Sequence, residues 1–335
     1  MKAVAYRQAL PIDHAESLLD VTLPDPTPGA RDLLVRVHAV SVNPVDTKLR
    51  RNAAPPEGQA KVLGWDAAGS VESVGPKVTL FKPGDRVYYA GDITRPGSNA
   101  ELQAVDERIV GRMPQSLDFA HAAALPLTTI TAWELLFNRL GVTAQTEGTL
   151  LIVGAAGGVG SILTQLARQL TRLTVIGTAS RPETQAWVRE LGAHQVIDHR
   201  QPLAAELKRI GIPQVSHVAS LTHTERHYAQ IVEALAPQGR LGLIDDLTQP
   251  LDVMALKGKA LSLHWEMMFA RSKFQTPDMQ AQHDLLNQVA TMVDEGRLRS
   301  TFGEHFGAIN AANLKRAHAF IEGGTARGKV VLEGF

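Results

Sequence analysis

The sequence predicts an α/β protein in which a compact, barrel-like β part precedes a doubly wound parallel sheet. Three observations predict this fold. Short strands separated by proline and glycine turns fill the chain from residue 2 to about residue 124. An apolar strand, a glycine-rich turn and an amphipathic helix then follow one another from residue 150. Beyond them, strands and helices alternate at the spacing of β-α-β units.

The composition indicates a soluble globular protein whose partners are small molecules. Of 335 residues, 44% are hydrophobic, and 34 Lys and Arg balance 34 Asp and Glu, so no net charge attracts nucleic acid or an acidic membrane. The first residues lack the apolar core of a signal peptide, and no segment approaches about 18 uninterrupted apolar residues. We therefore expect a cytoplasmic protein without nucleic-acid or membrane partners. Cysteine is absent, which excludes disulfides and thiolate metal ligands.

The β part is predicted from alternation and from turn residues. Residues 34–40 alternate apolar and polar side chains, as a half-buried strand does. Turn clusters at residues 24–32, 74–77, 82–87 and 95–101 divide the remaining strands. Residues 116–136 are rich in alanine and leucine and predict helix, with Pro126 as a break between two helices. This helical stretch is expected to cross from the first domain to the second.

Residues 150–160, LLIVGAAGGVG, combine a buried strand with a tight turn and the start of a helix. Ala155, Gly157 and Gly160 fit the pattern G-x-G-x-x-G with alanine in the first place. Many glycine-rich turns bind no ligand. Here the strand before the turn, the helix after it and a second strand at residues 174–179 favour dinucleotide binding. We expect the backbone of the turn to contact a pyrophosphate through Gly154, Ala155, Gly157, Gly158, Val159 and Gly160.

Six strands are expected to begin near residues 150, 174, 194, 214, 240 and 259, with amphipathic helices such as 183–191 and 225–235 between them. Gly192 and Gly239 lie where such helices should end. From about residue 279 the pattern changes to a long helix through residue 295, a second helix near residues 310–322 and a strand at residues 329–333. This tail is expected to return to the first domain. Residues 1–124 and 279–335 then form one domain, and residues 125–278 the other.

The end of the second strand of the parallel sheet predicts which dinucleotide binds. Proteins that select NAD usually carry an acidic residue there, which accepts the ribose hydroxyl. This chain has Ala179 or Ser180 at the position, followed by Arg181, whose guanidinium suits a 2′-phosphate. The sequence thus predicts NADPH rather than NADH; the alternative is that Arg181 is a solvated charge and Glu183 caps the next helix. His199 follows a later strand. It is expected to lie beside the adenosine, the alternative being that its place at a strand end has no role in binding.

The order of these parts resembles the medium-chain dehydrogenase/reductase superfamily. The resemblance is specifically to its zinc-free quinone oxidoreductase-like branch, which includes proteins labelled zinc-type alcohol dehydrogenase-like. It covers nearly the whole chain and implies a GroES-like catalytic domain and a Rossmann dinucleotide-binding domain. The stretches that carry it are specific only together: VNPVDTKLR (42–50), LGWDAAGSVESVG (63–75), FKPGDRV (81–87), ALPLTTITAWELL (124–136), GAAGGVGS (154–161), TASRPET (178–184), LGAHQVIDH (191–199) and RGKVVL (327–332).

The resemblance also implies that the protein works without zinc. Zinc-dependent members have Cys-x-x-Asp where this chain runs from Asn43 to Asp46, and Gly-His-Glu where it has Gly64, Trp65 and Asp66. Catalytic zinc takes thiolate, imidazole or carboxylate ligands, so asparagine and tryptophan at two of three positions leave no such site. The third ligand and the structural zinc lobe of the family use cysteine, which is absent. We expect no metal in this protein.

The resemblance and the missing zinc ligands point to an NADPH-dependent quinone or enone reductase. Nicotinamide supplies the hydride, and a conjugated acceptor delocalises the charge that it receives, so little side-chain catalysis is needed. Oxidation of an unactivated alcohol requires a Lewis acid or general base on the hydroxyl, and none is visible, which disfavours alcohol dehydrogenase activity. The alternatives are an NADPH-dependent alkenal reductase and a sensor or structural protein that binds NADPH with little turnover.

The resemblance assigns roles to four residues of the first domain or its border. It places Asn43 beside the nicotinamide, the alternative being an Asn-Pro turn that orders only its own backbone. Asp46 is expected to act through Asn43 without touching the ligand itself. Trp65 is expected to form a wall of the acceptor pocket, or to be core. Thr128 is expected to approach the nicotinamide amide.

Two arginines and one strand complete the expectations from the resemblance. Arg271 and Arg327 reach the cofactor or the acceptor, or else they are surface charges. Residues 259–268, KALSLHWEMM, are apolar enough to pair with a second copy as the last strand of the cofactor sheet. We therefore expect a homodimer that binds a small quinone or enone.

Overall fold

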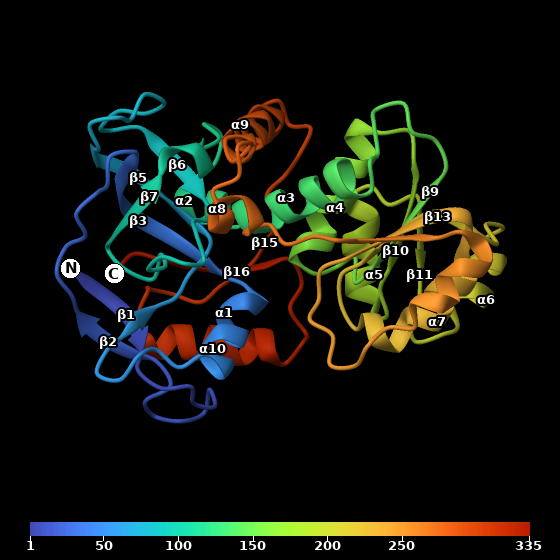
Figure 1. Cartoon of the computed structure of the whole chain (residues 1–335), viewed down its shortest axis with the longest axis horizontal. Coiled ribbons are helices and arrows are strands. Elements are labelled where there is room, and N and C mark those ends of the chain that lie inside the picture. The colour runs from blue at the N-terminus through green and yellow to red at the C-terminus, as the bar shows by residue number, and fades with distance from the viewer. The chain divides into compact units, whose positions relative to one another are not determined.

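The computed structural model describes residues 1–335, and its internal contacts divide the chain into two units (Figure 1). Unit 1 comprises Met1–Ile130 and Phe269–Phe335, and unit 2 comprises Thr131–Met268. The first boundary falls inside helix α3 (Pro126–Trp133), after the predicted boundary at residue 124. The second boundary falls before the predicted one at residue 278. The start of α3 belongs to unit 1 because Leu127 N donates to the Asp66 carboxylate over 2.7 Å.

Unit 1 is built around β3, which pairs antiparallel with three other strands. Val35 and Val37 on β3 are buried, whereas Arg36 between them is exposed, as the alternation predicted. The larger sheet of unit 1 contains β3 (Asp32–Val42), β5 (Ala67–Val74), β6 (Arg86–Tyr89), β7 (Leu102–Asp106), β8 (Val110–Arg112), β15 (Phe302–His305) and β16 (Lys329–Glu333). A smaller sheet contains β1 (Lys2–Tyr6), β2 (Leu19–Thr22) and β4 (Lys61–Val62).

The C-terminal segment returns to unit 1, as predicted. Strand β16 pairs antiparallel with β3, with Val330 opposite Val42. The predicted break at Pro126 is also confirmed, because α2 ends at Ala123 and α3 begins at Pro126. The helices of unit 1 besides α3 are α1 (Pro44–Asn52), the 3₁₀ helix η1 (Glu107–Ile109), α2 (Phe119–Ala123), α8 (Ala270–Phe274), α9 (Ala281–Asp294) and α10 (Ala311–Glu322).

Unit 2 is a doubly wound parallel sheet, which confirms the predicted fold class. The strand order is β11 (Gln195–Ile197), β10 (Thr174–Thr178), β9 (Thr149–Val153), β12 (Val215–Ser220), β13 (Leu235–Leu243) and β14 (Ser262–Trp265). Chain order reverses beside β9, and ligands of such sheets bind outside the carboxyl ends of the strands at that point. The other elements are the π-helical turn η2 (Glu134–Arg139), α4 (Gly158–Leu170), α5 (Pro182–Glu190), α6 (Leu203–Arg209), α7 (Thr224–Ala234) and the 3₁₀ helix η3 (Val253–Lys259).

Of the two predicted helix ends, one is confirmed and one is wrong. Gly192 follows α5 with φ of 104°, the left-handed conformation that glycine adopts readily. Gly239 ends no helix: α7 stops at Ala234, and Gly239 lies inside β13. The fully buried Leu235 takes an extended conformation directly after α7, so the strand starts there.

None of the helices in the structure combines the length and the hydropathy that a membrane crossing requires.

Candidate functional site

The glycine turn of unit 2 places backbone amide groups at the start of α4. Gly154 follows β9 with φ of 84°, and its N–H donates to Thr178 Oγ1 over 3.0 Å. The first helical hydrogen bond runs from Ser161 N to Gly157 O over 2.9 Å. The N–H groups of Gly158, Val159 and Gly160 precede this bond, so they have no partner within the helix. They form the kind of helix start that binds phosphate groups.

Two glycines of this turn differ in what surrounds their Cα atoms. A Cβ on Gly160 would lie 2.5 Å from Gly154 O and 2.6 Å from Ala155 Cα, so only glycine lets α4 pack this closely on the turn. A Cβ on Gly157 would meet nothing nearer than Gly154 O at 3.6 Å. Gly157 also has ordinary backbone angles, with φ of −73°. Packing within the chain therefore does not require glycine at position 157, and the space beside its Cα is open to a ligand.

The residues after β10 present a guanidinium and a hydroxyl. Arg181 is the N-cap residue of α5, with its backbone N donating to Thr184 Oγ1 over 3.3 Å. Its side chain is 39% exposed and pairs with Glu183 over 3.1 Å. Ser180 beside it is partly exposed. The pairing shows that the guanidinium is held near the strand end by a solvent-exposed carboxylate.

His199 lies at the same edge of the sheet. Its Nδ1 is 3.1 Å from Thr178 Oγ1, the hydroxyl that also accepts from Gly154 N. Burial is the largest cause that lowers the pKa of His199, so the ring is neutral at pH 7. The structure thus brings His199 to the end of β10, beside the glycine turn.

A second cluster lies inside unit 1, where Asn43 caps α1. The backbone N of Asn43 donates to Asp46 Oδ2 over 2.7 Å, the reciprocal bond of a capping box. The other oxygen of Asp46 accepts from Gly64 N over 3.0 Å. Both side chains are 1% exposed. Asp46 therefore joins the start of α1 to the segment that carries Gly64.

The side chain of Asn43 is held between Asp66 and Lys329. Its Nδ2 donates to Asp66 Oδ2 over 2.8 Å, and its Oδ1 accepts from the Lys329 ammonium. The ammonium also lies 3.0 Å from Asp66 Oδ2 and donates to Val42 O over 3.2 Å. Asp66 is fully buried and Lys329 is 3% exposed. Both ends of the Asn43 amide are thus fixed by charged neighbours.

The charges of this cluster are strongly perturbed. Burial raises the pKa of Asp46 to about 7, although the hydrogen bond from the backbone N–H of Asn43 and the Lys329 charge act in the opposite direction. Burial also raises the pKa of Asp66 against the same Lys329 charge. No three His, Asp or Glu side chains of the chain lie close enough together to hold a metal ion. The positive charge in this cluster is a lysine side chain.

Trp65 is fully buried in unit 1. Its Nε1 donates to Asp92 O over 3.3 Å, and its ring meets that of Phe269 edge to face at 6.2 Å between centroids. These contacts fix the ring in unit 1. They fit a core residue, and the predicted role of Trp65 in an acceptor pocket stays a prediction.

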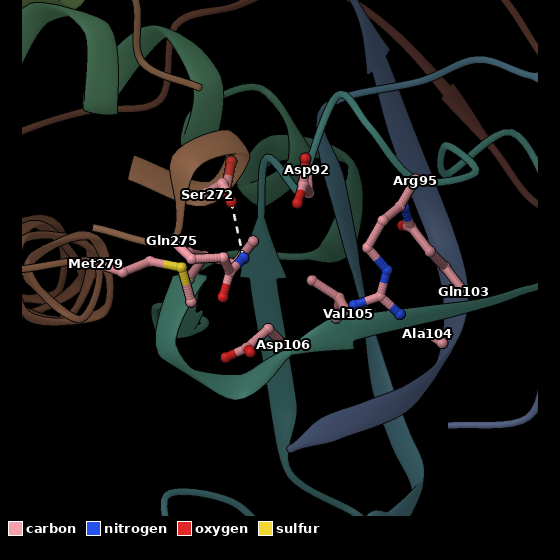
Figure 2. Close-up of a pocket in the computed structure, with 10 residues that line it drawn as sticks. Asp92, Arg95, Gln103, Ala104, Val105, Asp106, Ser272, Gln275 and Met279 are labelled. Atoms are coloured by element: carbon pink, nitrogen blue, oxygen red, sulfur yellow. Dashed lines mark hydrogen bonds between the residues drawn. The ribbon is translucent and has the colours of Figure 1, made fainter. Parts of the chain in front are cut away.

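Asp92 also borders a small polar pocket of about 40 Å³ on unit 1. Figure 2 shows Asp92, Arg95, Asp106 and Gln275 around it. The Arg95 guanidinium is already paired with Asp32, with N–O distances of 2.9 and 2.7 Å. A space of this size holds water molecules, not an organic acceptor.

The other predicted site residues are Thr128, Arg271 and Arg327. Thr128 is 3% exposed and donates to Leu125 O over 3.1 Å. Arg271 is buried and pairs with Asp278 through Nε over 3.0 Å. Arg327 is exposed. Their predicted contacts with cofactor or acceptor stay predictions.

Comparison with known proteins identifies the family. Residues 29–115 match the alcohol dehydrogenase GroES-like domain, and residues 191–332 match the zinc-binding dehydrogenase family. A zinc-type alcohol dehydrogenase-like protein of Staphylococcus aureus is 39% identical over 339 residues, which cover 99% of each chain. This chain belongs to the medium-chain dehydrogenase/reductase superfamily. A quinone oxidoreductase of Pseudomonas aeruginosa is 31% identical and covers 91% of this chain and 92% of its own.

Solved structures of the superfamily agree with this assignment. A Rhizobium etli protein whose name contains the words zinc-dependent alcohol dehydrogenase is 59% identical to this chain. The two structures superpose with a TM-score of 0.96, over 100% of this chain and 98% of the other. Membership in the superfamily makes the chain an oxidoreductase. It also confirms the expected GroES-like and Rossmann domains, and the GroES-like match lies within unit 1.

Two residues of the buried cluster in this superfamily member were not predicted as site residues. Asp66 enters the predictions only as the neighbour of Trp65, which replaces a zinc ligand, and of the nearby Arg327 and Lys329 only Arg327 is predicted to reach a ligand. A signal existed in each case. Asp66 is a carboxylate next to an apolar tryptophan, and Lys329 starts the apolar strand KVVL, where a charge must find a buried partner.

Proposed function

We propose that this superfamily member is a zinc-independent oxidoreductase that transfers a hydride from NADPH to a quinone or a conjugated enone. The observation that carries the proposal is the glycine turn, whose free amide groups at Gly158, Val159 and Gly160 suit a pyrophosphate. The quinone oxidoreductase relative supports the acceptor class. The experiment is a turnover screen of NADPH with quinones, enones, alkenals and alcohols, with and without a chelator.

The residues of the chain divide the work of binding and positioning. The turn from Gly154 to Gly160 would hold the pyrophosphate, and Ser180 with Arg181 the 2′-phosphate, with His199 beside the adenosine. Bound NADPH supplies the hydride. Asn43 and Thr128, the residues that the resemblance places at the nicotinamide, would orient the ring and exclude water.

Zinc independence is supported by the Asn43–Asp66–Lys329 cluster. The Lys329 ammonium lies against Asn43, at the position where zinc-dependent relatives carry a ligand. A divalent cation there would meet an existing positive charge and an amide side chain, which is a poor zinc ligand. We expect turnover of conjugated acceptors to survive chelation, and alcohol oxidation to stay undetectable.

The choice of NADPH predicts a selectivity that depends on Arg181. We expect wild-type kcat/KM to be higher with NADPH than with NADH, because a guanidinium forms charge-assisted hydrogen bonds with phosphate. Such bonds contribute about 1.5–3 kcal/mol, so Arg181→Ala should lower the NADPH preference by about 10- to 150-fold. The exposed Arg189 on the same helix α5 is the matched control, and Arg189→Ala should keep the preference. A wild type that prefers NADH contradicts this assignment.

Two alternatives are separated by the same screen. Turnover confined to alkenals would favour an alkenal reductase. A protein that binds NADPH but oxidises it no faster with any acceptor would be a sensor or a structural protein.

The proposal includes a homodimer formed along β14. This strand is the last in the sheet of unit 2 and has only β13 as a neighbour. The side chains of Trp265 and Met267 at its end are 51% and 45% exposed. Burial of such apolar area favours association, so Trp265→Glu should shift the protein from dimer to monomer in light scattering. Phe274→Glu, at a 68% exposed site in unit 1, is the control. A monomeric wild type would refute the dimer.

A further inference from the structure

Two buried glutamates of unit 2 lie side by side with one arginine. Glu134 begins the π-helical turn η2, in which Leu140 N reaches back five residues to Leu135 O over 2.9 Å. Glu266 directly follows β14, and its backbone N donates to Leu243 O at the end of β13 over 3.0 Å. Glu134 is fully buried and Glu266 is 3% exposed. The widened helical turn and the end of β14 thus meet at two carboxyl groups.

The Glu134–Glu266–Arg139 cluster is neutral only if it holds an extra proton. Arg139 Nε donates to Glu266 Oε2 over 2.8 Å, and its Nη2 lies 3.8 Å from Glu134 Oε2. Both buried carboxyl groups therefore lie against the same guanidinium. A second buried carboxylate would have no cation to balance its charge, so protonation of one of the pair is favoured. One guanidinium then balances one carboxylate.

The surroundings keep this proton in place at neutral pH. Burial, and then the charge of Glu134, raise the pKa of Glu266 to about 8, against the opposing charge of Arg139. The other ionisable groups on the packed elements add no negative charge. His264 on β14 has a pKa lowered by burial and is neutral, and the Arg240 guanidinium on β13 donates to Leu140 O, where η2 ends.

The position of the cluster links it to the ligand-binding edge of the sheet. All strands of unit 2 are parallel, so their carboxyl ends lie at one edge. Gly154 follows β9 at this edge, and Glu266 follows β14 at the same edge. The segment from Glu266 to Met268 therefore leaves the sheet where the second half of a dinucleotide lies in doubly wound folds.

We propose that Glu134 and Glu266 share one proton and, with Arg139, fix the end of β14 in the conformation that receives the nicotinamide half of the cofactor. Glu134, Glu266 and Arg139 act as positioning residues, because these buried carboxyl groups contact Arg139 and act on the cofactor only through the end of β14. When the O–H bond of the pair breaks, its proton passes to solvent and its electron pair stays on the carboxylate. The cluster then carries one unbalanced negative charge, which drives Glu266 away from Glu134 and weakens cofactor binding. The link to the cofactor rests on the proposed function, whereas the shared proton does not.

The test compares Glu266→Gln with the wild type across pH 6 to 9.5. Glutamine has the shape of the protonated acid and cannot ionise, so NADPH binding by the variant should not change with pH in this range. Loss of one proton predicts that the wild-type Kd rises about tenfold per pH unit above about pH 8, whereas that of Glu266→Gln stays level. Glu134→Gln should remove the rise in the same way, because either acid can carry the proton. Glu233→Gln, an exposed site on α7, is the matched control and should keep it.

Stability measured against pH tests the shared proton without any cofactor. The folded state keeps this proton up to about pH 8, whereas an unfolded glutamate loses it near its ordinary pKa of about 4.3. The free energy of unfolding should therefore fall as pH rises between these values, and less steeply in Glu266→Gln. Equal slopes would overturn the shared proton. A difference in slope with the same NADPH pH profile in all variants would overturn the positioning role. No NADPH binding by the wild type at any pH would instead overturn the proposed function.

Discussion

Lys329→Met is expected to lower the free energy of unfolding by about 3–5 kcal/mol, because it removes one partner of a buried ion pair. The ammonium lies 3.0 Å from Asp66 Oδ2 and also donates to the Asn43 amide. Methionine keeps much of the length of the side chain, so packing changes little, but Asp66 is left as a buried charge without its cation. Urea denaturation followed by circular dichroism measures the loss.

Two further variants separate the ion pair from other effects of the substitution. Lys77→Met removes an exposed lysine of the same unit and should change stability by less than about 0.5 kcal/mol. Combining Asp66→Asn with Lys329→Met removes both charges, so the double variant should lose less than the sum of the single variants, by about 1–3 kcal/mol. Additive losses, or a Lys329→Met protein as stable as the wild type, would mean that the two charges do not interact.

Gly157→Ala is expected to weaken NADPH binding without destabilising the fold. The new Cβ would meet no protein atom nearer than 3.6 Å, and the backbone angles suit alanine, so stability should stay equal or rise by up to about 1 kcal/mol. The methyl group would occupy the space through which a pyrophosphate approaches the turn. A steric cost of about 1–3 kcal/mol corresponds to a Kd up to about 150-fold higher. Fluorescence titration with NADPH measures this change.

Gly160→Ala provides the contrast within the same turn. Its Cβ would lie 2.5 to 2.7 Å from backbone atoms of Gly154 and Ala155, so α4 must move, and both stability and binding should suffer. Gly258→Ala, which has open space around its Cβ, is the neutral control for both measurements. If Gly157→Ala binds NADPH as tightly as the wild type, the turn does not hold a pyrophosphate.

Local patterns in the sequence were enough to predict the parallel sheet. Strand β9 is a short apolar run followed by turn residues, and the helix after residue 158 has its apolar side chains on one face. The failure at Gly239 shows the limit of this reasoning. A glycine marks a helix end only when nothing else ends the helix earlier, and burial of Leu235 in the sheet ended α7 before Gly239 was reached.

The buried charge clusters depend on contacts that no local pattern contains. Lys329 and Asn43 are 286 positions apart in the chain, and their contact exists only because β16 pairs with β3. Glu134 and Glu266 come from segments that are otherwise apolar, and the sequence gives no reason to pair them. A charged residue in an apolar segment is the available signal: it indicates that a partner exists, although it does not say which one.

The lysine beside Asn43 limits how a metal could enter this fold by substitution. Asn43→Cys and Trp65→His would supply a thiolate and an imidazole, but an incoming Zn²⁺ would meet the ammonium of Lys329. At a separation of about 4 Å and an effective dielectric constant of about 20, each pair of unit charges repels by about 4 kcal/mol. An evolutionary or engineered route to a zinc enzyme therefore has a required order, in which the lysine is replaced before the new ligands can be of use.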